Sequence, residues 1–128
     1  MDINSISGAV VDPAIRVNSE LGAGLLASTY EACLMHELQS RNIQVQNQLM
    51  LPVIYKQAKI DAGYRIDLLV AKEVIVELKA VEQLLPIHDA QLLTYLKLSQ
   101  KKAGLLINFN GSVAKSGSTG SSGELLLK

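Results

Sequence analysis

The chain has 128 residues, of which 48% are hydrophobic and 19% charged, so its composition is that of one globular domain and not of a disordered chain. The 12 Lys and Arg residues balance the 12 Asp and Glu residues, which excludes a strong global attraction to nucleic acid but leaves room for a local basic groove. The single cysteine, Cys33, excludes an intrachain disulfide or a zinc site built on cysteines. With no evident leader and no apolar run long enough to cross a bilayer, we expect a soluble cytoplasmic protein.

Two helices are expected at the start of the chain. Residues 4 to 21 repeat apolar side chains at steps of three and four, which is the spacing of one helix face. Pro13 lies inside this pattern and cannot donate its N–H, so we expect a kink or a break there, with Asp12 capping a restarted helix. The glycine-containing segment 22–24 ends the element, and residues 25 to 41 predict a second helix.

Three strands follow in the middle of the chain. Residues 44 to 55 alternate loosely as a strand, in which Pro52 fits an edge or a bulge. Residues 63 to 70 and 74 to 81 are two further apolar strands. Only three residues join these two strands, which favours a hairpin.

A helix and a last strand complete the predicted domain. Pro86 opens the helix, which runs to about Gln100, and "AGLLINFN" at residues 103–110 is the strand. The order helix, helix, three strands, helix, strand (ααβββαβ) predicts an α/β sandwich around a mixed sheet within residues 1–110. Residues 111–128 begin with a run of small and polar residues, so we expect a flexible Gly/Ser-rich tail there.

Charged side chains interrupt two of the apolar strands. Alternate residues share a strand face, so Glu77 and Lys79 point one way while Val76 and Leu78 point the other way. Asp67 interrupts the preceding strand, and in a hairpin it lies roughly opposite Glu77. Two carboxylates and one ammonium are therefore expected to converge at the ends of neighbouring strands.

A divalent metal would offset the cost of burying these charges unpaired. Asp67 and Glu77 supply the hard oxygen ligands that Mg²⁺ prefers, and the backbone carbonyl of Leu78 can supply another. Lys79 would then lie beside the attacking water or a phosphate, where it offsets developing negative charge. A single charge in a strand is more often a solvated face or a surface ion pair.

Four other side chains are candidates for contact with a substrate. Gln91 and Tyr95 stand four residues apart on one helix face and suit positioning a water, a phosphate or a carboxylate, although an amide and a phenol taken alone are more often ordinary side chains of a solvent-exposed helix face. Arg65 lies two residues before Asp67 on the same face, where it can meet a phosphate. His88, at the start of the same helix as Gln91, can approach the site.

These residues carry a family resemblance. Asp67, the "ELK" of residues 77–79 and Gln91-x-x-x-Tyr95 together resemble the PD-(D/E)xK nuclease superfamily, and the Gln/Tyr pair is similar to that of its RecB-like branch. The stretches that more closely resemble the small bacterial GxxExxY proteins are "LGAGLLASTYEACLMHEL", "YRIDLLV", "VIVELKAVEQLLPIHDAQLLTYLKL" and "GLLINFN".

The resemblance implies a restriction-endonuclease-like fold and a nuclease activity on DNA. It implies that Asp67 and Glu77 bind Mg²⁺, for which Mn²⁺ can substitute, and that Lys79 assists hydrolysis of a phosphodiester. Gln91 and Tyr95 would belong to the same catalytic centre. Small nucleases of this kind often pair, which leaves a homodimer open, although the sequence itself does not fix the oligomeric state.

The sequence departs from the family pattern at the glutamate that gives the family its name. The Gly-x-x-Glu-x-x-Tyr signature reads "GLLASTY" at residues 24–30, so Ala27 replaces the glutamate. Losing a ligand should lower metal affinity, although Glu31, one helical turn later, can partly compensate. Arg16 and Asn18 also differ from the residues expected in the first helix and should make the pocket less acidic.

Three functions therefore stay open. The first is Mg²⁺-dependent hydrolysis of DNA, with an activity that is impaired if catalysis needs the family glutamate that Ala27 replaces. The second is a catalytically inactive nuclease fold that binds nucleic acid or a protein partner. The third is a structural domain in which Glu77 and Lys79 form a closed ion pair, whose stability would not respond to Mg²⁺ or Mn²⁺.

Overall fold

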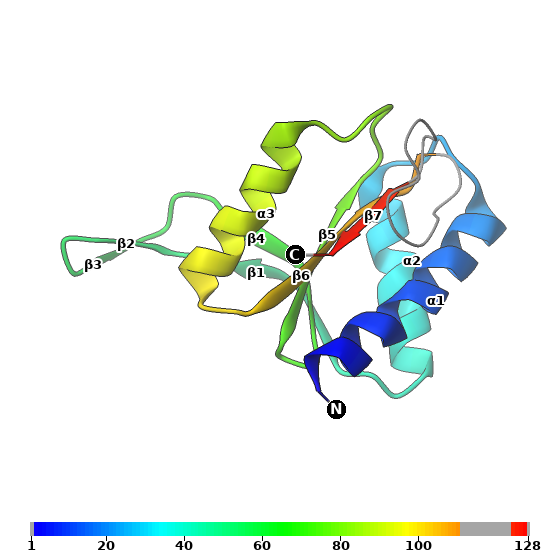
Figure 1. The fold of residues 1–128 in the computed structure, drawn as a ribbon, viewed down its shortest axis with the longest axis horizontal. Helices are drawn as coiled ribbons and strands as arrows, with labels where there is room; N and C mark the ends of the chain where they lie inside the picture. Colours follow the sequence, from blue (N-terminus) through cyan, green and yellow to red (C-terminus); the bar gives the residue numbers. More distant parts are fainter. Residues whose placement is uncertain (1, 111–123, 128) are drawn as a thin grey trace.

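A mixed five-stranded sheet forms the middle layer of the computed structural model, which describes residues 2–110 and 124–127 (Figure 1). Its strands, in spatial order, are β1 (Val45–Met50), β4 (Arg65–Val70), β5 (Val74–Lys79), β6 (Ala103–Asn108) and β7 (Glu124–Leu127). The pair β5 and β6 is parallel, and the other neighbours are antiparallel. The predicted fold class, an α/β sandwich around a mixed sheet, is confirmed.

Three helices cover the two faces of this sheet. One face packs against α1 (Ile3–Leu21) and α2 (Ala27–Ser40), and the other packs against α3 (Pro86–Ser99) (Figure 1). The alternation in β5 separates the two cores, since Val74 and Val76 join the α1/α2 side while Ile75 joins the α3 side. Within the part of the chain that the structure describes, no helix is long and apolar enough to cross a membrane.

The first helix is continuous through Pro13. The expected break is wrong, and the N-cap is Asp2, whose Oδ1 accepts a hydrogen bond from the Ser5 N–H at 2.7 Å. Pro13 is itself buried in the core face of α1, so tertiary packing holds the helix together across the missing backbone hydrogen bond. Gly22 ends α1 with φ 71°, as the glycine-containing segment predicts.

The hairpin of β4 and β5 forms as predicted. Its turn residues Ala71 and Lys72 have φ of 52° and 60°, and the Glu73 N–H donates to the Val70 carbonyl at 3.0 Å. Two positive φ values inside such a turn define a type I′ turn, whose twist suits a tight hairpin. This turn fixes the register that sets Asp67 against Glu77.

The predicted strand over residues 44–55 is split into two. After β1, the strand β2 (Val53–Tyr55) pairs with β3 (Ala58–Ile60) in a separate hairpin that extends away from the body of the molecule (Figure 1). Its turn residues, Lys56 and Gln57, have positive φ but include no Gly, Asn or Asp. The sequence therefore carries no turn signal at this point, and the hairpin was not predicted.

The boundary predicted at residue 110 does not end the sheet. Residues 111–123 and 128 of the predicted tail lie outside the described residues. Residues Glu124–Leu127, by contrast, pair antiparallel with β6 as strand β7. Because they supply three consecutive leucines, they suit a strand that covers the edge of β6.

Gly104 lies where α3 packs most closely on the sheet. A Cβ added there would lie 2.8 Å from the Leu92 Cδ1 atom and 3.3 Å from the Ile75 carbonyl oxygen. We predict that Gly104→Ala lowers the free energy of unfolding, measured by urea denaturation, by about 1–3 kcal/mol. Gly8→Ala is the matched control, because a Cβ there meets nothing within 4 Å and Ala is the better helix former. Equal effects of the two substitutions would contradict this packing.

Candidate functional site

The backbone pairing of β4 with β5 stops at Leu68 and Val76, one residue before Asp67 and Glu77 face each other. From there the two carboxylates replace the backbone ladder. The Asp67 N–H donates to Glu77 Oε2 at 3.2 Å, and the Leu78 N–H donates to Asp67 Oδ2 at 2.9 Å. Each acid thus binds the backbone of the other strand. The structure brings Asp67 and Glu77 together where the hairpin register predicts.

Gln48 in β1 lies opposite Asp67 on the other side of β4. The pairs of β1 and β4 on either side of it are regular, but Gln48 itself has φ 50°. Positive φ at a residue other than glycine stores backbone strain, which is concentrated at functional sites. The Gln48 Nε2 donates to Glu31 Oε1 at 2.7 Å and lies 3.3 Å from Asp67 Oδ1. A strained strand residue therefore links an acid of α2 to Asp67.

Glu77 is deeply buried, with 6% of its surface exposed. Among the described residues its Oε1 atom has no hydrogen-bond partner. Burial, and then the neighbouring Asp67, raises the pKa of Glu77 to about 10, and the Lys79 charge opposes this only weakly. Without an added cation, Glu77 is therefore protonated at neutral pH.

Lys79, Gln91 and Tyr95 form a row of polar side chains between β5 and α3. The Lys79 Nζ donates to Gln91 Oε1 at 3.4 Å, and the Gln91 Nε2 donates to Tyr95 Oη at 3.4 Å. Burial, and then the charges of Glu77 and Asp67, raises the pKa of the Tyr95 hydroxyl. The helix α3 therefore carries this row within electrostatic reach of the two acids.

The ammonium of Lys79 does not close onto an acid. The salt bridges of the described residues, within 4.0 Å, join Arg41 to Glu37 and Arg65 to Asp61, and none involves Lys79. A structural domain held by a closed Glu77–Lys79 pair is therefore not the observed arrangement.

The carbonyl group of Leu78 points toward the acids. In a strand, the N–H and C=O of one residue face the same neighbouring strand. The Leu78 N–H faces Asp67, whereas the next carbonyl, that of Lys79, accepts a hydrogen bond from the Phe109 N–H at 2.8 Å on the β6 side. The Leu78 carbonyl oxygen therefore faces the gap between β4 and β5.

The model of the PD-(D/E)XK nuclease superfamily matches residues 4–119, which include both charged strands and α3. The chain belongs to this nuclease superfamily. Its members hydrolyse phosphodiester bonds in nucleic acid and typically use divalent metal ions. Comparison with curated proteins and with solved structures gives no match. The finer assignments, to the GxxExxY proteins and the RecB-like branch, stay predictions.

The position that departs from the family pattern, Ala27, is the first residue of α2 in this nuclease fold. Glu31 lies one turn further and reaches Asp67 through Gln48. Burial raises the pKa of Glu31 above its ordinary value. The role of Gln48 was not predicted, because a glutamine in an exposed strand position gives no chemical signal in a sequence.

Two predicted substrate-binding residues have structural partners. The Arg65 Nη1 binds Asp61 Oδ1 at 3.2 Å and the Tyr64 carbonyl at 2.9 Å. The His88 Nδ1 accepts the Leu85 N–H at 3.0 Å and so caps α3. None of these hydrogen bonds connects Arg65 or His88 to the acid pair, and their contact with a substrate stays a prediction.

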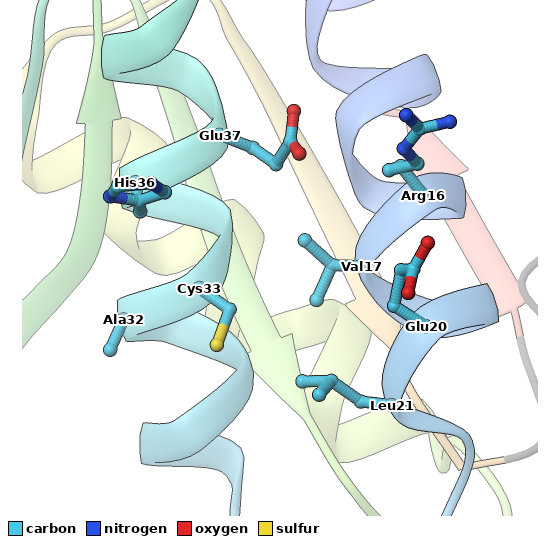
Figure 2. Close-up of a pocket in the computed structure, with 8 residues that line it drawn as sticks. All are labelled: Arg16, Val17, Glu20, Leu21, Ala32, Cys33, His36 and Glu37. Carbon is cyan, nitrogen blue, oxygen red and sulfur yellow. The ribbon is translucent and has the colours of Figure 1, made fainter.

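A groove of about 280 Å³ runs between α1 and α2, and Arg16 lines it together with Cys33, His36 and Glu37 (Figure 2). The buried Asn18 Nδ2 donates a hydrogen bond to the Phe109 carbonyl at 3.2 Å. Arg16 therefore lies in the α1/α2 groove and Asn18 contacts the chain after β6, and the expectation that they make the catalytic pocket less acidic stays a prediction. Asn18 is buried on the core-facing side of α1, whereas Arg16 is exposed.

The buried acid predicts a pH dependence of stability in the presence of a chelator. Between about pH 4.5 and about pH 10, folded Glu77 keeps a proton that the unfolded chain releases. Raising the pH therefore favours the unfolded state, and the free energy of unfolding should fall by up to about 1.4 kcal/mol per pH unit from this residue. Urea denaturation across this range measures the slope.

Glu77→Gln should remove that contribution to the slope. The control is Glu73→Gln, since Glu73 is exposed in the hairpin turn, and it should leave the slope unchanged. The same slope in the wild type and in Glu77→Gln would contradict a protonated Glu77.

Proposed function

We propose that the protein is a Mg²⁺-dependent deoxyribonuclease, for which Mn²⁺ can substitute. It would hydrolyse the phosphodiester bonds of DNA at a site formed by Asp67 and Glu77. One observation carries the proposal: the two acids meet where the strand ladder ends, and the buried Glu77 Oε1 lacks a hydrogen-bond partner among the described residues. A buried acid without a partner costs stability, so its retention beside Asp67 and Lys79 supports a functional reason.

The donors at this place fit a divalent cation of the Mg²⁺ type. The Glu77 Oε1, which has no partner among the residues that the structure describes, and the raised pKa of Glu77 both indicate that a positive partner would stabilise the ionised acid. The residues that would hold the ion are Asp67 and Glu77 through their carboxylates and Leu78 through its carbonyl, all of them hard oxygen donors. When bound, the ion polarises the phosphate and activates water.

The number of donors also suits Mg²⁺. Within the described ranges, no group of three or more His, Cys, Asp and Glu side chains is arranged to hold a metal ion. Structural and catalytic zinc sites take three or four such ligands, whereas Mg²⁺ commonly binds one or two carboxylates and completes its shell with water and phosphate. Two carboxylates and one carbonyl therefore favour Mg²⁺, the harder of the two ions.

Lys79 is the residue that we assign to the phosphate. In the part of the chain that the structure describes, no carboxylate lies within 4.0 Å of its ammonium, and Gln91 orients it from α3. A fixed positive charge beside the scissile phosphate offsets the negative charge that develops in the transition state. Gln91 and Tyr95 act in this proposal as positioning residues, because each of them reaches the site through its neighbour in the row.

A nuclease assay with Lys79→Ala tests the proposal. In Mg²⁺ or Mn²⁺, the wild type should cleave linear or circular DNA, and Lys79→Ala should lower kcat by about 100-fold or more. The control is Lys102→Ala, an exposed lysine near the opposite end of the parallel strands, which should retain activity. No cleavage of DNA by the wild type in either metal would contradict the enzyme.

Metal binding separates an inactive nuclease fold from a purely structural domain. Saturating Mg²⁺ or Mn²⁺ should raise the Tm of the wild type by mass action, and Asp67→Asn should abolish this rise. A wild type that binds the ion but does not cleave DNA would identify an inactive nuclease fold. A Tm that neither Mg²⁺ nor Mn²⁺ changes would contradict the metal site itself.

Glu31 should contribute to metal affinity through Gln48 and Asp67. We predict that Glu31→Gln weakens Mg²⁺ binding by about tenfold, as expected for a residue that orients a ligand, and that Ala27→Glu strengthens it. Titration calorimetry measures both changes. Glu37→Gln is the control on the same helix, because Glu37 faces the α1/α2 groove (Figure 2). Unchanged affinity in Glu31→Gln and Ala27→Glu would show that α2 has no role in the site.

A further inference from the structure

A second pocket adjoins the row of polar side chains. It has a volume of about 270 Å³, and its lining comes from the segment before β4 and from one face of α3. The lining residues are Tyr64, Ile87, Ala90, Gln91, Thr94 and Tyr95. The helical members stand at positions i, i+3, i+4, i+7 and i+8, so α3 presents them together on one side.

The pocket is joined to the candidate catalytic centre by Gln91. This residue lines the pocket and also accepts a hydrogen bond from the Lys79 Nζ at 3.4 Å. Tyr95, the other shared residue, accepts a hydrogen bond from the Gln91 Nε2 at 3.4 Å. A single side chain therefore separates the pocket from the lysine that we assign to the phosphate.

The lining of the pocket suits a flat, uncharged group. None of its six residues carries a formal charge at neutral pH, so the pocket does not suit a second phosphate. Tyr64 and Tyr95 meet edge to face, with ring centroids 5.9 Å apart and an interplanar angle of 64°. Such a pair leaves one ring face available for stacking, while Gln91 and Thr94 place an amide and a hydroxyl beside it.

The rim of the pocket exposes apolar surface as well. Ile87 is 66% exposed and Tyr64 is 40% exposed, although both border the same hollow. An occupant that covered both side chains would remove this apolar area from water. Aromatic faces with polar edges are the features of a nucleobase, and base stacking on tyrosine is a common way to hold a single strand.

We propose that this pocket binds one nucleobase of the substrate strand, next to the phosphate held at Lys79. The inference rests on the proposed nuclease function. A base that enters the pocket must leave the stack of its own strand, which costs least in single-stranded or frayed nucleic acid. The protein should therefore prefer single strands and open ends to the interior of a duplex.

The test is equilibrium binding of fluorescently labelled single-stranded DNA, followed by anisotropy in a chelator so that no cleavage occurs. A set of oligonucleotides carries one abasic position each, moved along the strand. For the wild type, one position should weaken binding by about 5- to 150-fold, the range expected for one lost base–aromatic stack.

Two variants locate this effect in the pocket. In Tyr64→Ala, the intact strand should bind as weakly as the abasic strand binds to the wild type, and the abasic penalty should disappear. Ala90→Leu, at an exposed helix position, should fill the pocket and give the same result without removing a ring. Leu93→Ala is the control, because Leu93 is exposed on α3 outside the lining and should keep the penalty.

Each outcome decides between the pocket and the nuclease function. An abasic scan without a sensitive position, or a penalty that persists in Tyr64→Ala and Ala90→Leu, would overturn the nucleobase pocket. If the wild type still cleaves DNA in Mg²⁺, the proposed nuclease survives that result. If the wild type neither binds single strands nor cleaves DNA, both proposals fail together. Tyr64→Ala should still bind Mg²⁺ as the wild type does, which excludes unfolding as the cause.

Discussion

The exchange of hydrogen bonds between Asp67 and Glu77 and the backbone of each other's strand is the interaction on which the candidate site depends. It occurs one residue beyond the last regular pair of β4 and β5, so the carboxylates bridge strands that the ladder no longer joins. Two acids held this close repel each other when both are ionised. The burial of Glu77 strengthens this effect, because water cannot screen the repulsion. A cation bound between the two acids would therefore remove this repulsion and stabilise the folded protein. The same hydrogen bonds to the backbone hold both acids in position to bind it.

The two helical layers contribute to this site in different ways. The layer of α1 and α2 packs on the apolar face of β5, and Glu31 of α2 is linked to Asp67 through the Gln48 side chain of β1. The other layer, α3, packs on the face that carries Glu77 and Lys79, and it supplies Gln91 and Tyr95. The close contact between Leu92 of α3 and Gly104 of β6 sets the distance between α3 and the sheet. Packing of an apolar helix face thus determines where the polar side chains lie.

The parts of the fold and site that could be predicted from the sequence are those with a local signal. Alternation in β5 predicts which face carries Glu77 and Lys79, and the short connection before it predicts the hairpin and its register. The proximity of Gln91 to Lys79 is predicted by the family resemblance and not by a local pattern, because their contact crosses from a strand to a helix.

Other features depend on contacts that no local pattern encodes. The left-handed backbone of Gln48 is imposed by its neighbours in the sheet, since glutamine has no preference for it. The hairpin of β2 and β3 turns without the residues typical of such turns, and Pro13 stays helical because it is buried. Strand β7 is separated from β6 along the chain by a segment of small and polar residues, so no hydrophobic periodicity in the sequence predicts that the two strands pair.

The proposed function requires that Asp67 and Glu77 form a site for a divalent cation. The most direct measurement is the anomalous scattering of crystals grown with Mn²⁺. We expect one peak between the carboxylates of Asp67 and Glu77, on the side of the Leu78 carbonyl. A map without a peak there, in which Lys79 has instead closed onto the Glu77 carboxylate, would rule out the cation site and give the two charges a purely structural role.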